Sequence, residues 1–499
     1  MRILVLLLLV APSFAQDILV IAPKDYHEAL QPWIAHRSAQ GHEIAIAEPG
    51  EDPRPVVQAV AKSSDGKLRF VLLVGDVKQV PAHFYDAIVI KKWEKNPRVA
   101  SDNRTADLDG DHIPDVAIGR MPADSPADAK LMLGKVIEYE NNRDFTSWRR
   151  RVNVVASVGG FGAMQDRAIE TAATMFLKQN VPAAYDMHVT YGKPDSPFCP
   201  PPSKIMATTL ERFNEGSLFV AYIGHGHKLG FDRVRFQKQS WDIFEEDNAY
   251  EIKARHGMPI AFLLCCTTGH FDGAPDCIAE IMVRQPKGPV AVIASSRVSM
   301  PYGNAPLAKE LLEAVFLERK ATLGEAFLQA KVRSITPKAG DQQRAQIEFL
   351  SNIYEADAAK RKQERIEHLY LYNLIGDPSM RIPHPEVAKL KLPDQAAAGA
   401  LVEIEIEAPI GGRYTVDVLQ ERTPGLPGRK NDTDAEFERV YKRSNNWVRA
   451  TTSGTAEAGT FKVKVQLPER LVATTYDVRI WIENDKGAAL GNGRLKIRN

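Results

Sequence analysis

The stretch Met258-Pro-Ile-Ala-Phe-Leu-Leu-Cys-Cys-Thr-Thr-Gly-His-Phe271 decides how the rest of the chain is interpreted. Its apolar run ends abruptly at two cysteines and a small polar turn, which is typical of a buried strand in a parallel sheet. A second apolar run, Ser217-Leu-Phe-Val-Ala-Tyr-Ile-Gly-His-Gly226, breaks off in the same way around His225. Because ligands bind beyond the carboxyl ends of parallel strands, the two runs predict a thiol and an imidazole at one site.

Of the two adjacent cysteines, Cys266 is the predicted nucleophile. Successive strand residues point to opposite faces, so Cys265 and Cys266 cannot both face the site if the strand reaches them. Cys266 comes last, where the chain turns into Thr267-Thr268-Gly269, and we expect its side chain and its N–H to be exposed. Cys265 is then expected to be a small buried hydrophobe. The alternative for the pair is two packed core thiols.

The order of these blocks resembles the gingipain family of cysteine peptidases, in the caspase-like clan. Further blocks in the same order strengthen the resemblance over residues 17 to 380: Phe70–Asp76, Asp107–Arg120, Asp276-Cys-Ile-Ala-Glu280, Gly288–Ser296 and Tyr372–Pro378. The resemblance implies an α/β fold with caspase-like parallel sheets covered by helices in two subdomains. Alternating strand and helix patterns from residue 17 onward favour the same class.

The resemblance also implies a mechanism of peptide-bond hydrolysis. Cys266 attacks the scissile carbonyl, and His225 transfers the proton. The backbone N–H groups of Gly226 and Cys266 hold the oxyanion. Asp115 is the candidate for orienting His225, and Asp128 matches a carboxylate at the base of the primary pocket in Arg-cleaving members. His227, two residues after His225, is the alternative imidazole.

Several acidic residues have a local explanation as well. Asp128 completes a capping box that begins at Ser125, and that role alone explains its presence. A run of four acids, which does not fit the spacing of an EF-hand, could form a turn or hold structural calcium: Asp107, Asp109, Asp111 and Asp115. We expect no required cofactor.

The strand expected at residues 289–294 is followed by residues that should wall the substrate cleft. These are Ser295, Ser296 and the segment that leads to Tyr302. Gingipain-type sequences place a tryptophan in this segment, where the present chain has Pro301, so the wall of the pocket is expected to differ.

Composition is that of an ordinary soluble globular protein: 44% hydrophobic and 25% charged residues, with a net charge of +1 over 499 residues. It indicates neither a nucleic-acid surface nor a membrane span. Residues 1–15 are typical of a secretory signal peptide, with Arg2 followed by an apolar run and a small-residue site ending at Ala15. We therefore expect an exported protein, secreted or periplasmic, and a monomer that acts on proteins or peptides.

We expect four segments along the chain. After the signal peptide come an N-terminal α/β subdomain at 16–145, a catalytic α/β subdomain at 146–385 and an immunoglobulin-like β-sandwich at 386–499. The rival hypothesis is an inactive or zinc-binding relative that serves as a secreted binding or adhesion module, because His225, His227, Cys265, Cys266 and His270 are all potential zinc ligands. For Cys199 and Cys277, a disulfide and free thiols are equally expected.

Overall fold

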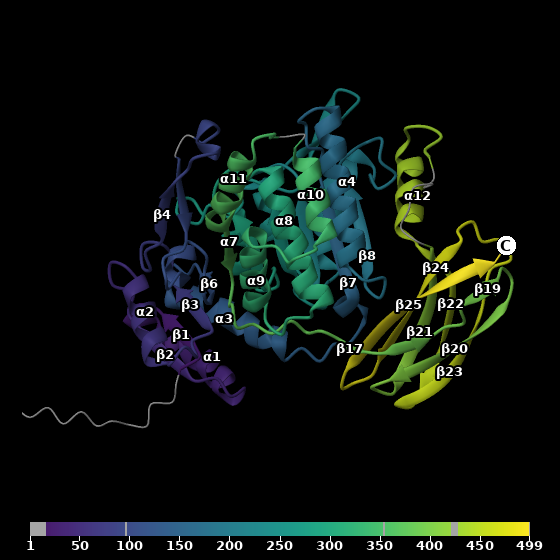
Figure 1. Cartoon of the computed structure of the whole chain (residues 1–499), viewed down its shortest axis with the longest axis horizontal. Coiled ribbons are helices and arrows are strands. Elements are labelled where there is room, and N and C mark those ends of the chain that lie inside the picture. The colour runs from purple at the N-terminus through teal and green to yellow at the C-terminus, as the bar shows by residue number, and fades with distance from the viewer. Residues whose placement is uncertain (1–15, 95–96, 353–354, 421–427, 499) are drawn as a thin grey trace, which may run out of the picture.

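The computed structural model describes residues 16–94, 97–352, 355–420 and 428–498, so the expected signal peptide at 1–15 lies outside the described residues. One ten-stranded sheet runs through the part of the chain that ends near residue 375, and a separate β-rich part follows it (Figure 1). Within the described ranges, no helix combines the length and the apolar character needed to cross a membrane.

The ten strands of the central sheet are short and largely buried. In spatial order they are β2 (Ile44–Ala47), β1 (Ile18–Ile21), β3 (Phe70–Val74), β6 (Ala117–Met121), β16 (Tyr372–Ile375), β15 (Ala291–Ser295), β14 (Ile260–Leu264), β9 (Phe219–Ile223), β7 (Arg151–Ala156) and β8 (Asp186–Tyr191). All neighbours are parallel except β15 and β16, which are antiparallel. Three short antiparallel pairs lie outside this sheet: β4 (His83–Asp86) with β5 (Arg98–Ser101), β10 (Gly226–His227) with β11 (Gly230–Phe231), and β12 (Arg233–Phe236) with β13 (Gln239–Asp242).

The antiparallel pair within the central sheet reverses the direction of one half of that sheet relative to the other. The parallel sheets expected for two subdomains are therefore joined into one mixed sheet, with β16 as the strand between the halves. The carboxyl ends of β9, β14 and β15 lie at the same edge as the amino end of β6. The chain passes from one half of the sheet to the other between β6 and β7.

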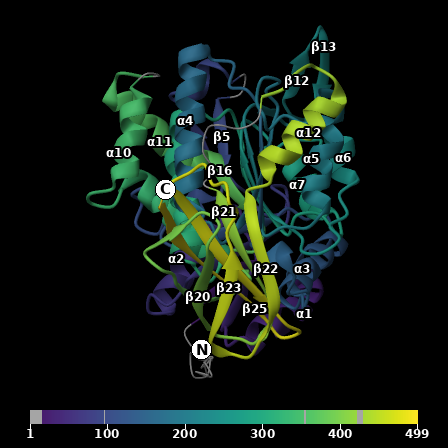
Figure 2. The same ribbon diagram turned by 90° about the vertical axis from the view of Figure 1, so that its right-hand side faces the viewer.

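Helices cover both faces of the sheet, as Figure 2 shows from the side. One layer consists of α1 (His27–Ala39), α3 (Pro126–Glu140), α5 (Ile205–Asn214), α6 (Glu246–Tyr250) and α7 (Ile278–Arg284). The other consists of α2 (Arg54–Ser63), α4 (Ala163–Asn180), α8 (Pro301–Leu312), α9 (Leu323–Ile335), α10 (Gln342–Ser351) and α11 (Ala358–Leu371). Helix α3 begins at the expected N-cap, where Ser125 Oγ accepts from the N–H of Asp128 at 3.2 Å. The expected capping box is only half formed, because the Asp128 carboxylate accepts from the Ser125 hydroxyl and not from its backbone N–H.

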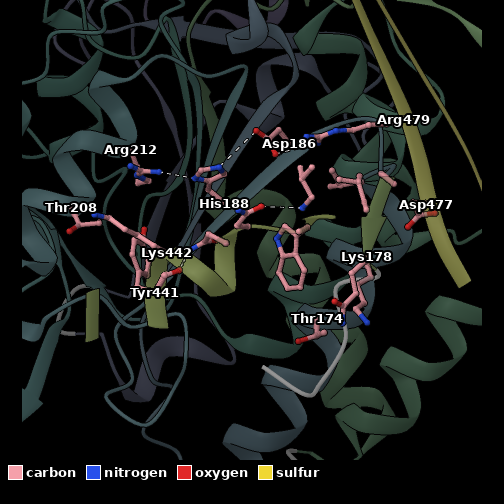
Figure 3. Close-up of a pocket in the computed structure, with 18 of the residues that line it drawn as sticks. Thr174, Lys178, Asp186, His188, Thr208, Arg212, Tyr441, Lys442, Asp477 and Arg479 are labelled. Carbon is pink, nitrogen blue, oxygen red and sulfur yellow. Dashed lines mark hydrogen bonds and ion pairs between the residues drawn. The ribbon is translucent and has the colours of Figure 1, made fainter. Parts of the chain in front are cut away.

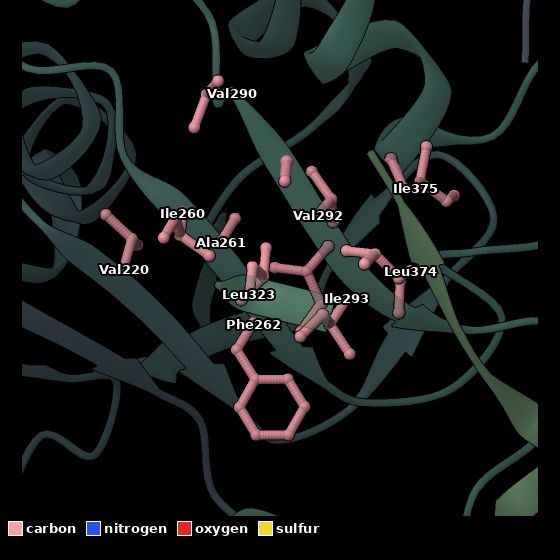
Figure 4. Close-up of a cluster of buried hydrophobic side chains, with 14 of the residues drawn as sticks. Val220, Ile260, Ala261, Phe262, Val290, Val292, Ile293, Leu323, Leu374 and Ile375 are labelled. Atoms are coloured by element: carbon pink, nitrogen blue, oxygen red, sulfur yellow. The ribbon is translucent and has the colours of Figure 1, made fainter. Parts of the chain in front are cut away.

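The centre of the sheet is a continuous apolar core. Side chains of β9, β14, β15 and β16 pack there with Leu323 of α9, as seen in Figure 4. Phe262 is 1% exposed, which is representative of the group. Burial on both faces explains why β9, β14 and β15 are largely apolar runs. Strand β16 departs from this pattern, because the buried Asn373 lies within it.

The C-terminal part consists of two sheets around one core. The larger contains β17 (Glu386–Val387), β25 (Ala488–Arg498), β24 (Thr475–Glu483), β21 (Gly412–Gln420), β22 (Val448–Ala456) and β19 (Gln395–Ala397), and the smaller contains β18 (Lys389–Lys391), β20 (Leu401–Ala408) and β23 (Gly459–Gln466). Ile404 and Val463 of the smaller sheet share a core with Val416 and Val478 of the larger. The expected β-sandwich architecture is therefore present.

One helix of this C-terminal part was not predicted. Helix α12 (Asp434–Asn445) interrupts the β pattern between β21 and β22 and packs against β8 of the central sheet. Asn445 accepts from the N–H of Val189 at 2.8 Å and donates to its carbonyl oxygen at 2.9 Å. These bonds extend the edge of the central sheet onto the C-terminal part, which fixes one to the other.

Candidate active site

His225 and Cys266, the two predicted reactive residues, follow neighbouring parallel strands and lie at equivalent positions beyond the strand ends. Ile223 of β9 pairs with Leu264 of β14, and the N–H of Gly224 donates to the carbonyl of Leu264 at 3.3 Å. His225 and Cys266 each lie two residues beyond that pair. Because parallel strands are about 4.8 Å apart, the register brings the imidazole and the thiol to one point at the edge of the sheet.

The two adjacent cysteines have different surroundings. Cys265 is 1% exposed, and its sulfur lies 3.4 Å from Thr268 Oγ1. Cys266 is partly exposed and borders a cavity, and the N–H of Ser299 donates to its sulfur at 3.4 Å. Burial raises the pKa of both thiols above the ordinary value. All four cysteines, including Cys199 and Cys277, are free thiols.

The chain turns sharply directly after Cys266. Thr267 has a φ of +54°, in the left-handed region that residues with a branched Cβ rarely adopt. Its N–H donates to the carbonyl of Arg297 at 3.0 Å, which holds the turn in place. Such backbone conformations cost of order 1–3 kcal/mol and concentrate at functional sites. The turn ends the strand at Cys266 and leaves its side chain at the cavity.

The backbone of His225 is held on both sides. Its N–H donates to Ser157 Oγ at 3.1 Å, and its carbonyl accepts from the hydroxyl of Tyr222 at 2.6 Å. Ser157 directly follows β7, so a third strand end supports the histidine. The ring itself lies 5.3 Å, centroid to centroid, from the ring of Phe161.

The imidazole of His225 makes one hydrogen bond that defines its tautomer. Its Nε2 is hydrogen-bonded to the carbonyl oxygen of Gly159. A carbonyl only accepts, so Nε2 carries the proton. In the neutral ring Nδ1 is then the unprotonated nitrogen, which is the form that a general base requires.

Gly226 allows the two strand ends to approach each other closely. A Cβ added at this position would lie 2.7 Å from the sulfur of Cys265 and 3.0 Å from the carbonyl oxygen of Cys266. Only glycine fits this approach. It brings the backbone of the His225 segment against that of the Cys266 segment, where both predicted oxyanion donors are located.

The structure does not bring Asp115 to His225. Asp115 lies at the same edge of the sheet, just before β6, but four strand positions from β9, which is about 19 Å. Its carboxylate accepts from the N–H of Leu108 at 2.6 Å and closes a surface turn. Burial of part of this turn raises the pKa of Asp115. The group on the histidine ring is the Gly159 carbonyl instead.

Asp128 is also remote from the thiol. It follows β6 at the opposite edge of the sheet from Cys266, because β6 runs opposite to β14. Its carboxylate accepts from the hydroxyl of Ser125 at 2.8 Å, so the residue caps α3. The hydrogen bond that the structure records for the Asp128 side chain is this local one with Ser125.

The three residues expected to wall the cleft are placed differently from one another. Ser295 and Ser296 are fully buried, and their hydroxyls donate at 2.7 Å to the carbonyls of Arg297 and Ala100 respectively. Neither lines the cavity at Cys266, whereas Tyr302 does. The hydroxyl of Tyr302 donates to Glu348 at 2.7 Å, which fixes its ring as part of the wall.

The remaining candidate ligands do not gather around the thiol. His227 is exposed and 3.2 Å from Glu245, and His270 lies 3.5 Å from Asp272. In the described ranges, the groups of three or more His, Cys, Asp or Glu close enough to share a metal ion contain carboxylates alone. One of them is the expected trio Asp107, Asp109 and Asp111, whose oxygens lie within 4.8 Å of one another.

A cavity of about 450 Å³ opens beside Cys266 and His225. It extends from the strand ends between α4, α8 and α10. A larger hollow of about 1490 Å³ lies elsewhere, between α4, α5 and the C-terminal part (Figure 3). Several of its polar side chains contact one another: Arg212 is hydrogen-bonded to His188 at 3.0 Å, and Arg479 pairs with Asp186 at 3.3 Å. The larger hollow includes neither reactive residue.

Sequence reasoning missed the residues that come from the end of β7 and from the loop before α8. Ser157, Gly159 and Phe161 surround His225, and Ser299 contacts Cys266. A signal was present, because Gly159-Gly160 follows a predicted strand just as Gly224 and Gly226 do. That β7 lies beside β9 is a property of the sheet order, which the strand pattern alone does not contain.

Comparison with known proteins agrees with this geometry. The model of peptidase family C25 matches residues 11–383. Gingipain R2 of Porphyromonas gingivalis is 25% identical over 293 residues, which cover 56% of this chain and 36% of that protein. Lys-gingipain of the same organism is 25% identical over 296 residues, 56% of this chain and 15% of that protein. The chain thus matches only about a third of the first relative's length.

Solved structures show the same fold. The crystal structure of the Arg specific cysteine proteinase gingipain R has a TM-score of 0.55 at 18% identity and covers 98% of this chain and 99% of its own. A complex of the pro- and mature domains of RgpB from Porphyromonas gingivalis has a TM-score of 0.56 at 18% identity, with coverages of 97% and 100%. The expected caspase-like α/β core is confirmed by this likeness.

The sheet, the His225 strand end and the Cys266 strand end together define the class of gingipain-type cysteine peptidases, as the resemblance predicted. The chain belongs to peptidase family C25.

Proposed function

We propose that the protein is an exported cysteine endopeptidase in which Cys266 is the nucleophile and His225 the general base. The observation that carries this proposal is the register of β9 and β14. Ile223 and Leu264 are partners, and each reactive residue follows its strand by two positions. The tautomer imposed by Gly159 supports the role of the histidine.

The proposed reaction has two stages. His225 Nδ1 takes the thiol proton as the sulfur of Cys266 attacks the scissile carbonyl carbon. The backbone N–H groups of Gly226 and Cys266 hold the oxyanion, where each donor is worth roughly 2.7–4 kcal/mol. The imidazolium returns the proton to the leaving amine, and a thioester remains. His225 then takes a proton from water, and the hydroxide attacks the thioester and releases the acid. The imidazolium returns its proton to the departing sulfur, which restores the thiol.

A matched pair of variants tests this assignment. The purified protein is incubated with a mixed peptide library and a mild reductant, and cleavage is followed by mass spectrometry. Cys266→Ala should abolish hydrolysis, whereas Cys265→Ala, which removes a neighbouring buried thiol, should leave most of it. Activity that survives in Cys266→Ala, or that is lost only in Cys265→Ala, contradicts the proposed nucleophile.

A zinc-binding or inactive module is the second candidate function, and the same preparation tests it. Stoichiometric zinc in the purified protein, with no hydrolysis of any peptide, would favour it. Among the described residues, only carboxylates gather closely enough to share an ion, which argues against zinc held jointly by the histidines and cysteines.

We further propose that the turn formed by Asp107, Asp109 and Asp111 holds structural calcium. The proximity of their oxygens supports it, because hard cations prefer several oxygen ligands at short range. The turn is already closed by Asp107, whose carboxylate accepts from the N–H groups of Gly110 at 2.6 Å and His112 at 3.2 Å. Calcium would neutralise these carboxylates and stiffen the turn, with no part in the reaction.

Export, a monomeric state and an immunoglobulin-like class for the C-terminal sandwich complete the proposal. The sequence of residues 1–15 supports export, and the two sheets around one core support the domain class. The N-terminal sequence of the mature protein and its mass by light scattering test the first two. A mature chain that retains residues 1–15, or a mass near twice 55.4 kDa, would contradict them.

A further inference from the structure

We propose that the cavity beside Cys266 is the primary specificity pocket and that it takes a large apolar side chain, such as Phe, Leu or Met, from the residue before the scissile bond. The proposal rests on the function proposed above, since it concerns the substrate of the same site. Its starting point is position: Cys266 and His225 both border the cavity, so a carbonyl held at the thiol places its own side chain at the opening.

Apart from His225 and Cys266, the described lining of the cavity is mainly apolar and contains no acidic or basic side chain. Three helices supply most of the apolar lining, including Ile169 and Phe176 from α4, Tyr302 and Ala305 from α8, and Ile347 and Leu350 from α10. None of the described residues that line it is Asp, Glu, Lys or Arg. A cationic side chain in this space would be removed from water without a carboxylate partner, which is strongly unfavourable.

Acidic residues in the segments around the cavity are engaged elsewhere. Glu94 accepts from the N–H of Val298 at 2.7 Å, and Glu348 accepts from the hydroxyl of Tyr302 at 2.7 Å. Asp166 accepts from the N–H of Phe161 at 3.0 Å. Each of these carboxylates fixes a wall of the cavity and none of them lines it, although Glu94 is near enough to the thiol to contribute to the raised pKa of Cys266. The described lining therefore offers no acid to the side chain of an Arg or Lys residue.

The depth of the cavity also indicates that it receives a whole side chain of the substrate and not a flat contact at the surface. At the floor, Phe176 is 4% exposed and Ile347 is 2% exposed. At the mouth, Phe161 is 43% exposed and Trp93 is 48% exposed. An apolar group that passes these two rings would be buried on all sides, and burial of apolar surface is the main source of affinity in such a pocket.

The experiment uses a series of fluorogenic peptides that differ only in the residue before the cleaved bond: Phe, Leu, Arg, Lys or Asp. We expect kcat/KM for Phe or Leu to exceed that for Arg or Lys by about 100-fold or more, and Cys266→Ala to hydrolyse none. A preference for Arg or Lys would overturn the pocket assignment and leave the proposed function intact. Failure to hydrolyse any peptide would overturn both.

Two substitutions on α4 localise the effect. Ala173→Asp places an acid in the cavity, and Thr174→Asp places the same charge on the exposed side of the same helix. Ala173→Asp should lower kcat/KM for the Phe peptide at least tenfold and raise the ratio of Arg to Phe hydrolysis. Thr174→Asp should leave that ratio unchanged. Equal effects of the two variants would overturn the assignment.

An apolar substitution keeps the test valid if the buried acid impairs folding. Ala173→Leu fills part of the cavity and should reduce hydrolysis after Phe more than hydrolysis after Ala, with Thr174→Leu as its control. Melting temperatures measured for all four variants separate unfolding from a change of specificity. A uniform loss over all peptides in a folded Ala173→Leu protein would count against the pocket.

Discussion

The backbone N–H of Ser299 donates to the sulfur of Cys266 at 3.4 Å, so the thiol meets a hydrogen-bond donor from the loop that follows β15. This bond favours the thiolate, whereas burial, the larger influence, disfavours it. The net result is a pKa above the ordinary value. A raised pKa suits a mechanism in which His225 removes the proton as substrate binds.

Alkylation of Cys266 by iodoacetamide should consequently require a higher pH than alkylation of an unfolded cysteine peptide. The thiolate is the reacting form, and a raised pKa moves its appearance to higher pH. Peptide mapping at a series of pH values measures the midpoint at Cys266. Cys266→Ala gives the background from the three buried cysteines. A midpoint at or below that of the peptide would contradict the influence of burial.

Gly226→Ala should reduce both stability and activity. The new Cβ would lie 2.7 Å from the sulfur of Cys265, and overpacking of this kind costs about 1–3 kcal/mol. Because that sulfur is the nearest atom, Cys265→Ala in the same chain should recover part of the loss. Unfolding in urea and kcat/KM for the two single variants and the double variant give the coupling. If the effects of Gly226→Ala and Cys265→Ala on the free energy of unfolding are strictly additive, the contact with the Cys265 sulfur is not the cause of the loss.

Asp128→Ala should act on stability and not on specificity. The Ser125 hydroxyl donates to the Asp128 carboxylate at 2.8 Å, and loss of such a cap costs about 1 kcal/mol. The melting temperature should fall, while the ratio of hydrolysis after Arg to hydrolysis after Phe stays constant. Ser125→Ala, which breaks the same cap from the other side, is the matched control. A fall in that ratio in Asp128→Ala alone would assign the residue to the substrate.

Asp115→Asn should likewise leave the reaction intact. Its carboxylate accepts from Leu108 in a turn that is about 19 Å from β9, so kcat/KM should stay within about twofold. The variant tests whether Asp115 or the Gly159 carbonyl is the group that orients His225. A large fall in kcat at unchanged melting temperature would favour the acid.

Calcium should raise the melting temperature through the turn at Asp107. Asp109→Asn removes one carboxylate of the trio and should abolish the increase, which differential scanning fluorimetry would measure with and without EDTA. Asp65→Asn, in an exposed turn elsewhere, should retain it. The same increase in both variants would place any calcium effect outside this turn.

The sequence contained much of the site because strand ends can be recognised without knowledge of the fold. An apolar run that breaks into glycine or cysteine identifies where a buried strand stops, and His225 and Cys266 were found in this way. Gly159 contributes through its carbonyl oxygen, which every residue has, so its role on the histidine ring could not be predicted. The signal that the sequence did contain is the glycine itself, because a Cβ at this position would lie 2.5 Å from a carboxylate oxygen of Asp166.

The positions of Asp115 and Asp128 required the order and direction of the strands. Both flank β6, which runs opposite to β14 because β16 lies between the halves of the sheet. Local sequence patterns do not reveal that β16 lies beside β6, because the two strands are far apart in the sequence. Strand β6 ends at Met121, and β16 begins only at Tyr372.

Helix α12 was missed although its sequence carries a local signal. Acids occupy its first turn and bases its last, and the buried Phe437 and Val440 are spaced for one face of a helix. The prediction of strands on both sides of this segment led to its being interpreted as a loop. Its apolar face is covered by a distant part of the chain, since the ring centroid of Phe437 lies 5.5 Å from that of Phe236 in β12.

The place of β16 in the sheet also limits the order in which the fold can be completed during synthesis. Residues 372–375 are made after every other strand of the sheet, and until then β6 and β15 are open edges with no partner between them. Helix α10, which supplies Ile347 to the cavity, is also a late segment. The two halves of the sheet can therefore be joined only after both His225 and Cys266 have been made.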